Sequence, residues 1–365
     1  MEKIRRNYSF DFLKIVASIG IVFFHYQYLT GARFDNFINF CGDWFNWGML
    51  VELFFIISGY FMFRNISVIA EGRVTLFNWW KKRAVRLLPM AAITVFFFEG
   101  ILILNKLVFH TNLWGIEVSV WGTLVTALGL QEGWILISPA INMSLWYLSV
   151  LMFCYIFFYM LTVLAAKIKC SPLYFYIIMI LIGVAGGAFG FNLPFLNWQI
   201  CRGYYAFFFG ILLAAYVNKY GVRLKEIIAS FLIIACFVTA FILYPTHIAK
   251  NINYTLTFLF YPAIVLLCET KVAKKIFCHK IWGVLSGISF EVYLWHVPLL
   301  LLLYFIMNFF GFGLNFSIIW IMLLFLLAVW IISTLIYFLV ERPLMKVLTK
   351  EKKKKAEDTN EVSST

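Results

Sequence analysis

The segment 10–28, FDFLKIVASIGIVFFHYQY, combines an apolar run long enough to cross a bilayer with side chains that can carry chemistry. Four of its polar side chains are Asp11, Lys14, Ser18 and His25. At 100° per residue, all four fall on a helical face about 60° wide. Ionisable groups in a hydrocarbon layer are costly and usually face a protein interior or a water-filled cavity. The shared face therefore predicts a buried site.

His25 is the candidate general base of this site, because imidazole titrates near neutral pH. The alternative is a buried, hydrogen-bonded histidine that only holds helices together. Lys14 lies eleven residues earlier, roughly 16 Å along a helix. That spacing would put a cation near one membrane face and a base deep towards the other.

Composition identifies the environment in which these residues act. Of the 365 residues, 63% are hydrophobic and 13% are charged, whereas soluble domains have about 45–50% apolar and about 25% charged residues. The chain is therefore predicted to be an all-α polytopic membrane protein. Its net charge of +13 does not indicate nucleic-acid binding, because the basic residues follow the membrane loops.

Ten apolar runs are close to the ~20 residues needed for a span, and ten spans put both termini on the same side. They lie at about 10–30, 44–63, 88–108, 144–166, 173–191, 200–217, 227–245, 252–268, 284–310 and 316–340. With the N-terminus cytoplasmic, 25 of the 30 Lys and Arg residues fall on the cytoplasmic side, as the positive-inside rule requires. We therefore expect a multi-pass protein of the bacterial cytoplasmic membrane.

The expected domain organisation is a transmembrane domain over residues 1–345 and a disordered cytoplasmic tail over 346–365. The lysine run of the tail would contact anionic lipid. The outer stretch 109–143 contains an apolar segment, 120–130, that is too short to span and would lie in the interface. Tryptophans in this stretch would anchor it there or offer faces for sugar stacking.

Two further groups of polar residues lie near the ends of predicted spans. Glu52 is at a depth similar to that of His25, so it could orient the imidazole, or else form a structural ion pair. Arg83 and Arg86 stand at the cytoplasmic mouth with Lys14, where guanidinium groups suit phosphates. Alternatively, these arginines only mark the cytoplasmic side of the membrane, as the positive-inside rule requires. The small pair at 58–59, Ser-Gly, indicates close helix packing.

The ninth and fourth spans supply candidate substrate contacts. Tyr293 and His296 share one face of the ninth span, just before Pro298, and form a second polar wall. Trp146 and Tyr147 open the fourth span at the outer side. The chain shows no metal-binding signature and no Gly-rich phosphate loop, so we expect no metal and no bound cofactor.

Six segments together resemble the acyltransferase-3 family of integral membrane acyltransferases. They run from Asp11 to Pro343 in family order, and they are DFLKIVASIGIVFFH, VELFFIISGYF, KKRAVRLLP, SLWYL, ISFEVYLWHVPLL and VERP. The resemblance implies transfer of an acyl group, usually acetyl, from cytoplasmic acyl-CoA to a hydroxyl of an extracytoplasmic glycan or related molecule. The family pattern on the catalytic helix is an Arg followed after ten residues by a His. His25 matches it, but Lys14 stands at the arginine position.

The resemblance also assigns roles that we carry as expectations. Arg83 and Arg86 match the basic motif at the third span, and Glu52 matches an acidic position before a Phe-Phe pair. The expected enzyme is a membrane O-acyltransferase, in particular an O-acetyltransferase acting on a cell-envelope polysaccharide or its lipid-linked precursor, with acetyl-CoA as donor substrate. The alternative is a secondary transporter with a polar path of histidine and carboxylate groups. The absence of a sequence repeat between the two halves argues against it.

Overall fold

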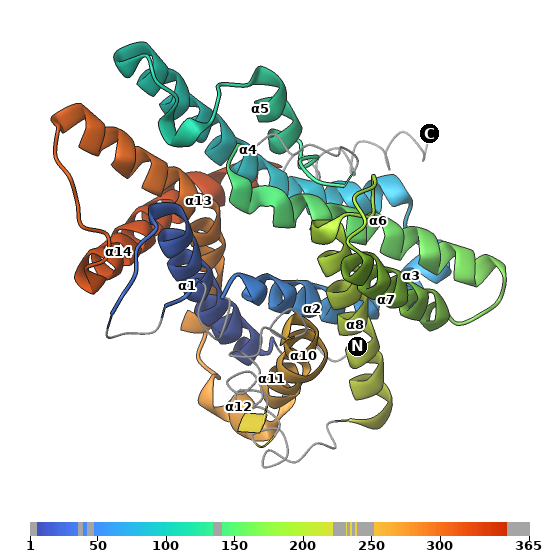
Figure 1. Ribbon diagram of the computed structural model, residues 1–365. Coiled ribbons are helices and arrows are strands. Elements are labelled where there is room, and N and C mark those ends of the chain that lie inside the picture. The colour runs from blue at the N-terminus through green and yellow to red at the C-terminus, as the bar shows by residue number, and fades with distance from the viewer. Residues whose placement is uncertain are drawn as a thin grey trace.

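The computed structural model describes residues 6–35, 39–41, 47–133, 141–221, 231, 234, 235, 238 and 252–348. Regular structure in these residues is helical (Figure 1), apart from one isolated bridge between Leu193 and Leu196. Eight of the described helical segments are long and apolar enough to cross a membrane. The chain is therefore an all-α polytopic membrane protein, as predicted.

The main helices correspond closely to the predicted spans. They are α1 (Tyr8–Thr30), α2 (Leu50–Met62), α3 (Ile66–Ala70), α4 (Leu76–Phe109), α5 (Val120–Ala127), α6 (Trp146–Lys167), α7 (Pro172–Phe189), α8 (Trp198–Tyr220), α13 (Ile281–Phe310) and α14 (Ile319–Ile336). The run predicted at 252–268 is a shorter helical unit made of α10 (Ile252–Thr255), a π-helical turn (Leu256–Phe260) and α11 (Tyr261–Glu269), and the short α12 (Lys271–Ile276) follows it. The span predicted at 227–245 falls largely, and the tail beyond 348 falls wholly, outside the described residues.

The third membrane helix is longer than the sequence predicts. It begins at Leu76 instead of near residue 88, because the side chain of Thr75 accepts a hydrogen bond from the backbone N–H of Asn78 and caps the helix. The 34 residues of α4 measure about 51 Å at 1.5 Å per residue. The basic entry segment, with both of its arginines, is therefore part of the helix.

Helices α1 and α13 lie side by side and run in the same direction. The rings of Phe12 and Trp282 meet edge to face near the start of each helix, with 5.0 Å between their centres. Further along, His25 of α1 meets His296 of α13. The two contacts are separated by nearly the same number of residues in each helix, which keeps the pair parallel and in register.

Helices α2 and α8 approach each other through glycine. A Cβ atom at Gly59 would collide with the carbonyl oxygen of Phe207, and one at Gly210 would collide with that of Ile56. Small residues allow this close backbone contact between membrane helices. The close packing predicted at Ser58-Gly59 is confirmed.

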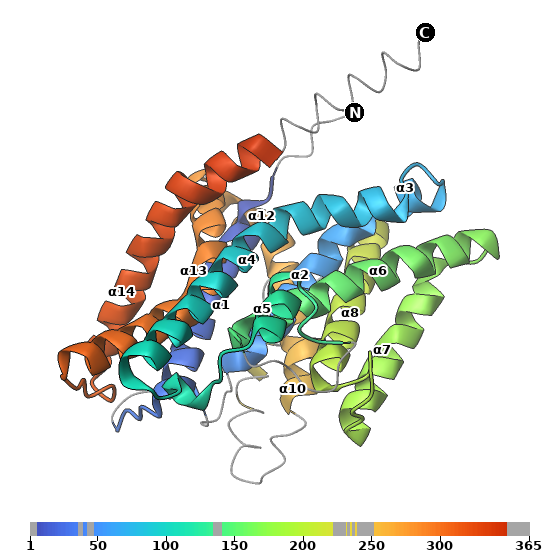
Figure 2. The ribbon, with the colours of Figure 1, turned by 90° about the horizontal axis from the view of Figure 1, so that it is seen from above.

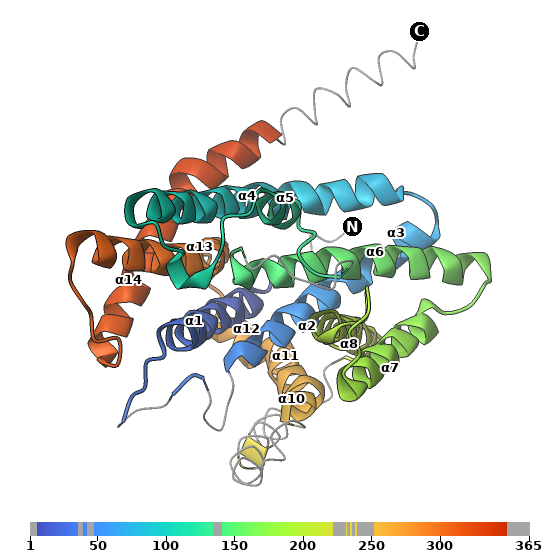
Figure 3. The ribbon, with the colours of Figure 1, turned by 45° about the horizontal axis from the view of Figure 1, so that its top comes forward.

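The arrangement of the helices places α1 and α2 inside the bundle. Figure 3 shows α1 and α2 between α4 and α6 on one side and α10 and α11 on the other. In Figure 2, α3, α12 and the end of the helix that continues α14 to Leu348 lie towards one edge, while the turn between α13 and α14 lies towards the opposite one. The beginning of α1 and the end of the last described helix point to the same edge.

Candidate active site

The imidazole of His25, on α1, lies against that of His296, on α13. Nδ1 of His25 and Nε2 of His296 are 2.9 Å apart, and Nδ1 of His296 is 2.7 Å from the carbonyl oxygen of Tyr293. Only 8% of His25 and 1% of His296 are exposed. The residues predicted as two separate polar walls therefore form one buried cluster. Nε2 of His25 takes no part in the hydrogen bond to His296.

Aromatic side chains extend this cluster across the bundle. The ring of Tyr293 lies 5.9 Å from that of His296 and 5.8 Å from that of Tyr147. The hydroxyl groups of Tyr147 and Ser58 are hydrogen-bonded at 3.4 Å. Three of the predicted substrate contacts are therefore brought together with His25. They add two aromatic rings to the cluster, and the hydroxyl group of Tyr293 donates to the carbonyl oxygen of Ser144.

Glu52 is not the partner of His25 that the sequence predicts. Its carboxylate accepts two hydrogen bonds from Arg202 on α8, from Nε at 2.7 Å and from Nη2 at 3.0 Å, and a third from the hydroxyl of Tyr205 at 3.3 Å. Similar depth in two helices does not decide which way the side chains point, and His25 meets His296 instead. The predicted contact between Glu52 and His25 is therefore not formed, and Glu52 belongs to a buried ion pair.

Arg202 is the interior residue that sequence reasoning missed. Its guanidinium group lies 4.7 Å from the ring centre of Trp146 and also donates to the carbonyl oxygen of Gly48 at 3.1 Å. The available signal was a single arginine inside the apolar run WQICRGYYAFFFG. Trp146, predicted to contact substrate, thus holds one side of this ion pair through a cation–π contact.

The N-terminal end of α1 carries a separate charged group. Asp11 accepts two hydrogen bonds from Arg6, at 2.7 and 2.9 Å, whereas Nζ of Lys14 is 4.0 Å from the same carboxylate. Ser18 donates to the carbonyl oxygen of Ile15 in its own helix at 2.8 Å. Of the two cations near Asp11, Arg6 therefore forms the close ion pair, and Lys14 makes the weaker contact.

The two arginines of α4 have different surroundings. Arg86 is exposed and close enough to Lys14 for the two charges to interact. The guanidinium carbon of Arg83 lies 3.0 Å from the ring centre of Trp79, and its Nη1 donates to the carbonyl oxygen of the same residue at 2.9 Å. The charges of Lys14 and Arg86 thus act on each other, whereas Arg83 packs on its own helix and also contacts Met62 of α2 and Tyr155 of α6.

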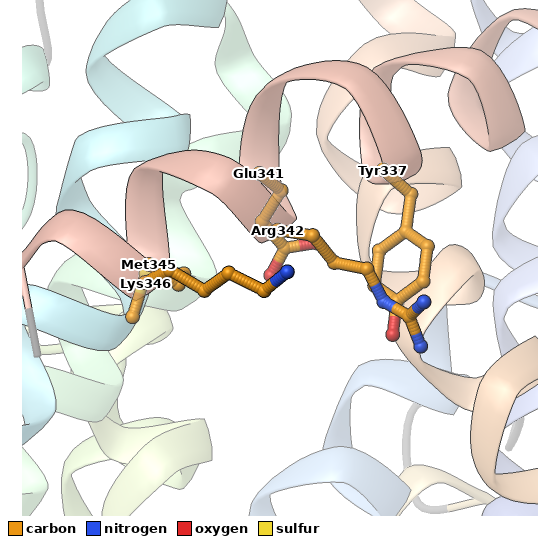
Figure 4. Close-up of a pocket in the computed structure, with 5 residues that line it drawn as sticks. All are labelled: Tyr337, Glu341, Arg342, Met345 and Lys346. Atoms are coloured by element: carbon orange, nitrogen blue, oxygen red, sulfur yellow. The ribbon is translucent and has the colours of Figure 1, made fainter.

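A hollow of about 370 Å³ opens at the same end of the bundle (Figure 4). Its lining comes from the helix that continues α14, and consists of Tyr337, Glu341, Arg342, Met345 and Lys346. Neither Lys14 nor Arg86 lines the hollow, but the charge of Arg86 acts on Glu341 in its wall. Among the described residues, no three His, Cys, Asp or Glu side chains gather closely enough to hold a metal ion.

Comparison with known proteins identifies the family. The model described as an acyltransferase domain, that of the acyltransferase-3 family, matches residues 7–338. The chain therefore belongs to this family and is a membrane acyltransferase. This family membership favours an enzyme over the alternative of a secondary transporter. No curated protein and no solved structure matches the chain.

Proposed function

We propose that this acyltransferase moves an acetyl group from cytoplasmic acyl-CoA to a hydroxyl of an extracytoplasmic cell-envelope polysaccharide or its lipid-linked precursor, in the cytoplasmic membrane of a bacterium. One observation carries the proposal. Helix α1 presents Lys14 beside Arg86 at one end of the bundle and, about 16 Å further along, His25 among aromatic side chains, with Nε2 outside its hydrogen bond to His296.

The charged end of the bundle suits the phosphates of the donor. Arg86 offers a planar guanidinium fork for phosphate oxygens, and Lys14 supplies a point charge. Arg342 and Lys346 add positive charge at the hollow. The long pantetheine arm of CoA would then carry the thioester away from these cations and along α1 towards His25. Arg83 would act indirectly, by shaping this end of α4.

The chemical step uses His25 as general base. The acceptor hydroxyl attacks the thioester carbonyl carbon while its proton passes to Nε2 of His25. The carbon–sulfur bond then breaks, and the departing thiolate takes the proton from the imidazolium. The products are an ester of the acceptor and free CoA thiol, and His25 returns to its neutral state.

The acceptor would bind on the aromatic side of His25. Tyr147 and Tyr293 offer ring faces and hydroxyl groups of the kind that hold a sugar. The ring of Trp146 has one face near Arg202, which leaves its other side for packing. On the outer helix α5, Trp121 is 61% exposed and could provide a first contact for a polymer or an anchor in the interface.

The proposal is tested with the purified protein in nanodiscs. Radiolabelled acetyl-CoA is supplied with a lipid-linked glycan fraction from the source membrane, and both free CoA thiol and alkali-labile label on the glycan are measured. We expect equal amounts of thiol and ester, dependent on the glycan. Label transferred only from succinyl-CoA or a longer acyl-CoA would contradict the acetyl assignment. Absence of thiol release with every acyl-CoA would contradict the donor assignment.

A further inference from the structure

We infer that His296 is a positioning residue that holds His25 in the tautomer whose Nε2 is unprotonated. The inference rests on the proposed role of His25 as base, and it deepens that role. It replaces the orientation by a carboxylate that the sequence predicts. Its basis is the chain of contacts from the carbonyl oxygen of Tyr293 through His296 to His25, with both imidazoles buried.

The protons of this chain can be placed from the chemistry of its atoms. A backbone carbonyl oxygen only accepts hydrogen bonds, so Nδ1 of His296 at 2.7 Å must carry a hydrogen. In a neutral imidazole the other nitrogen is then an acceptor, so Nε2 of His296 has a lone pair. Nδ1 of His25, 2.9 Å away, must therefore be the donor. Neutral His25 consequently has its lone pair on Nε2.

The opposite polarity would need a charged His296, with hydrogens on both nitrogens, and His25 protonated at Nε2. Burying such a charge is costly unless it is paired. None of the ion pairs among the described residues includes either histidine. The arrangement in which both imidazoles are neutral is therefore favoured. In this arrangement Nε2 of His25 can accept a proton.

The same contact supports His25 during the reaction. When Nε2 takes the proton of the acceptor hydroxyl, the hydrogen on Nδ1 strengthens its bond to Nε2 of His296, because donors that carry positive charge form stronger hydrogen bonds. No proton leaves the pair until the thiolate takes one back from Nε2. His296 thus acts on the acceptor hydroxyl through His25 and need not touch it.

Two substitutions separate positioning from other roles. His296→Gln puts an amide oxygen near the former Nε2 and keeps an acceptor for Nδ1 of His25, whereas His296→Asn reaches only towards the former Nδ1. We expect the Gln variant to stay within about fivefold of wild-type kcat. The Asn variant should lose about 10- to 100-fold, the range seen when partners that orient a functional histidine are removed, with the KM values for acetyl-CoA and acceptor unchanged.

Nitrogen-15 NMR of histidine-labelled protein in nanodiscs tests the tautomer without reference to activity. The His25 signals are assigned by their loss in His25→Gln. We expect unprotonated Nε2 and protonated Nδ1 in the wild type and in His296→Gln, and a mixture in His296→Asn. A wild-type His25 protonated at Nε2 would overturn the inference. So would equal losses in both variants, or a change confined to the KM of the acceptor, which would make His296 a substrate contact.

Failure of the proposed function gives a different pattern. If His25 is not the base, His25→Gln retains transfer while the wild-type tautomer measured by NMR stays the same. If His25 is the base but His296 does not position it, His25→Gln is inactive and the two His296 variants have equal rates.

Discussion

Among the buried polar pairs of the described residues, Glu52 with Arg202 and His25 with His296 differ in charge. Glu52 and Arg202 form an ion pair with two hydrogen bonds, and the side chain of Glu52 is fully buried. The rings of His25 and His296 are joined by one hydrogen bond, in which Nε2 of His25 takes no part. An ion pair whose bonds are satisfied suits a structural role, whereas a ring nitrogen outside that bond suits proton transfer.

Loss of Arg202 should therefore destabilise the protein. Arg202→Leu leaves the buried carboxylate of Glu52 without its cation, a change that costs about 3–5 kcal/mol in buried pairs. We expect a lower melting temperature in detergent. The matched control, Glu52→Leu with Arg202→Leu, removes both charges and should recover much of the loss. A double variant less stable than Arg202→Leu alone would contradict this account.

The basic residues of α4 permit a second test. Arg86→Ala should raise the KM for acetyl-CoA with little change in kcat, because Arg86 is exposed beside Lys14. Arg83→Ala is the matched control on the same helix. It removes a side chain stacked on Trp79 and should lower the melting temperature more than it changes KM. Equal effects on KM would show that both arginines meet the donor.

At this scale the sequence predicted which residues face the interior but not which ones touch. Helical phase placed Lys14 and His25 on one face, and both lie where that face requires. The partner of each side chain depends on which helices are neighbours. The periodicity of a single helix does not contain this information. Glu52 was therefore assigned to His25, and Arg202 was overlooked although its charge made it conspicuous.

At the scale of helices, two pairings position the site. The parallel pair α1 and α13 brings the histidines to the same depth, and the close pair α2 and α8 fixes the ion pair beside them. The pairing of α2 with α8 depends on glycine, which has no side chain, at positions 59 and 210 where the helices cross. The sequence indicated this crossing through Ser58-Gly59, but it did not identify α8 as the partner.

A methyl group at the crossing should force these helices apart. Gly59→Ala would collide with the carbonyl oxygen of Phe207, whereas Gly100→Ala on α4 meets no atom within 4 Å. We expect Gly59→Ala to lose about 1–3 kcal/mol, the usual cost of overpacking, and Gly100→Ala to be neutral or slightly stabilising. Thermal unfolding in the same detergent compares the two. Equal stability would contradict the tight crossing.

At the scale of the whole molecule, hydropathy and charge predicted the fold well. The bilayer imposes helix length, and lysine and arginine mark the loops on one side, so eight of the ten predicted runs are found as helices that can span. The sequence could not show that α4 begins so early. A helix that leaves the membrane keeps its backbone pattern while its side chains become polar, so hydropathy ends before the helix does.

The predicted orientation can be measured with single cysteines. In a variant whose other six cysteines are replaced, the exposed Cys278, before α13, should react with a membrane-impermeant maleimide only in inside-out vesicles. In a cysteine-free background, Gly313→Cys, after α13 (Ile281–Phe310), should react only in right-side-out ones. The opposite pattern would put Lys14 and Arg86 on the outer face and would exclude a cytoplasmic donor site there.

The catalytic role of His25 is the central claim, and one measurement tests it most directly. Release of CoA thiol from saturating acetyl-CoA is followed with acceptor present, for wild type and His25→Ala at equal amounts of folded protein. Removal of a general base typically costs about 10²–10⁴-fold. We predict a loss of kcat in that range with an unchanged melting temperature. A variant that keeps more than about half of the wild-type rate, far above that range, would contradict the assignment.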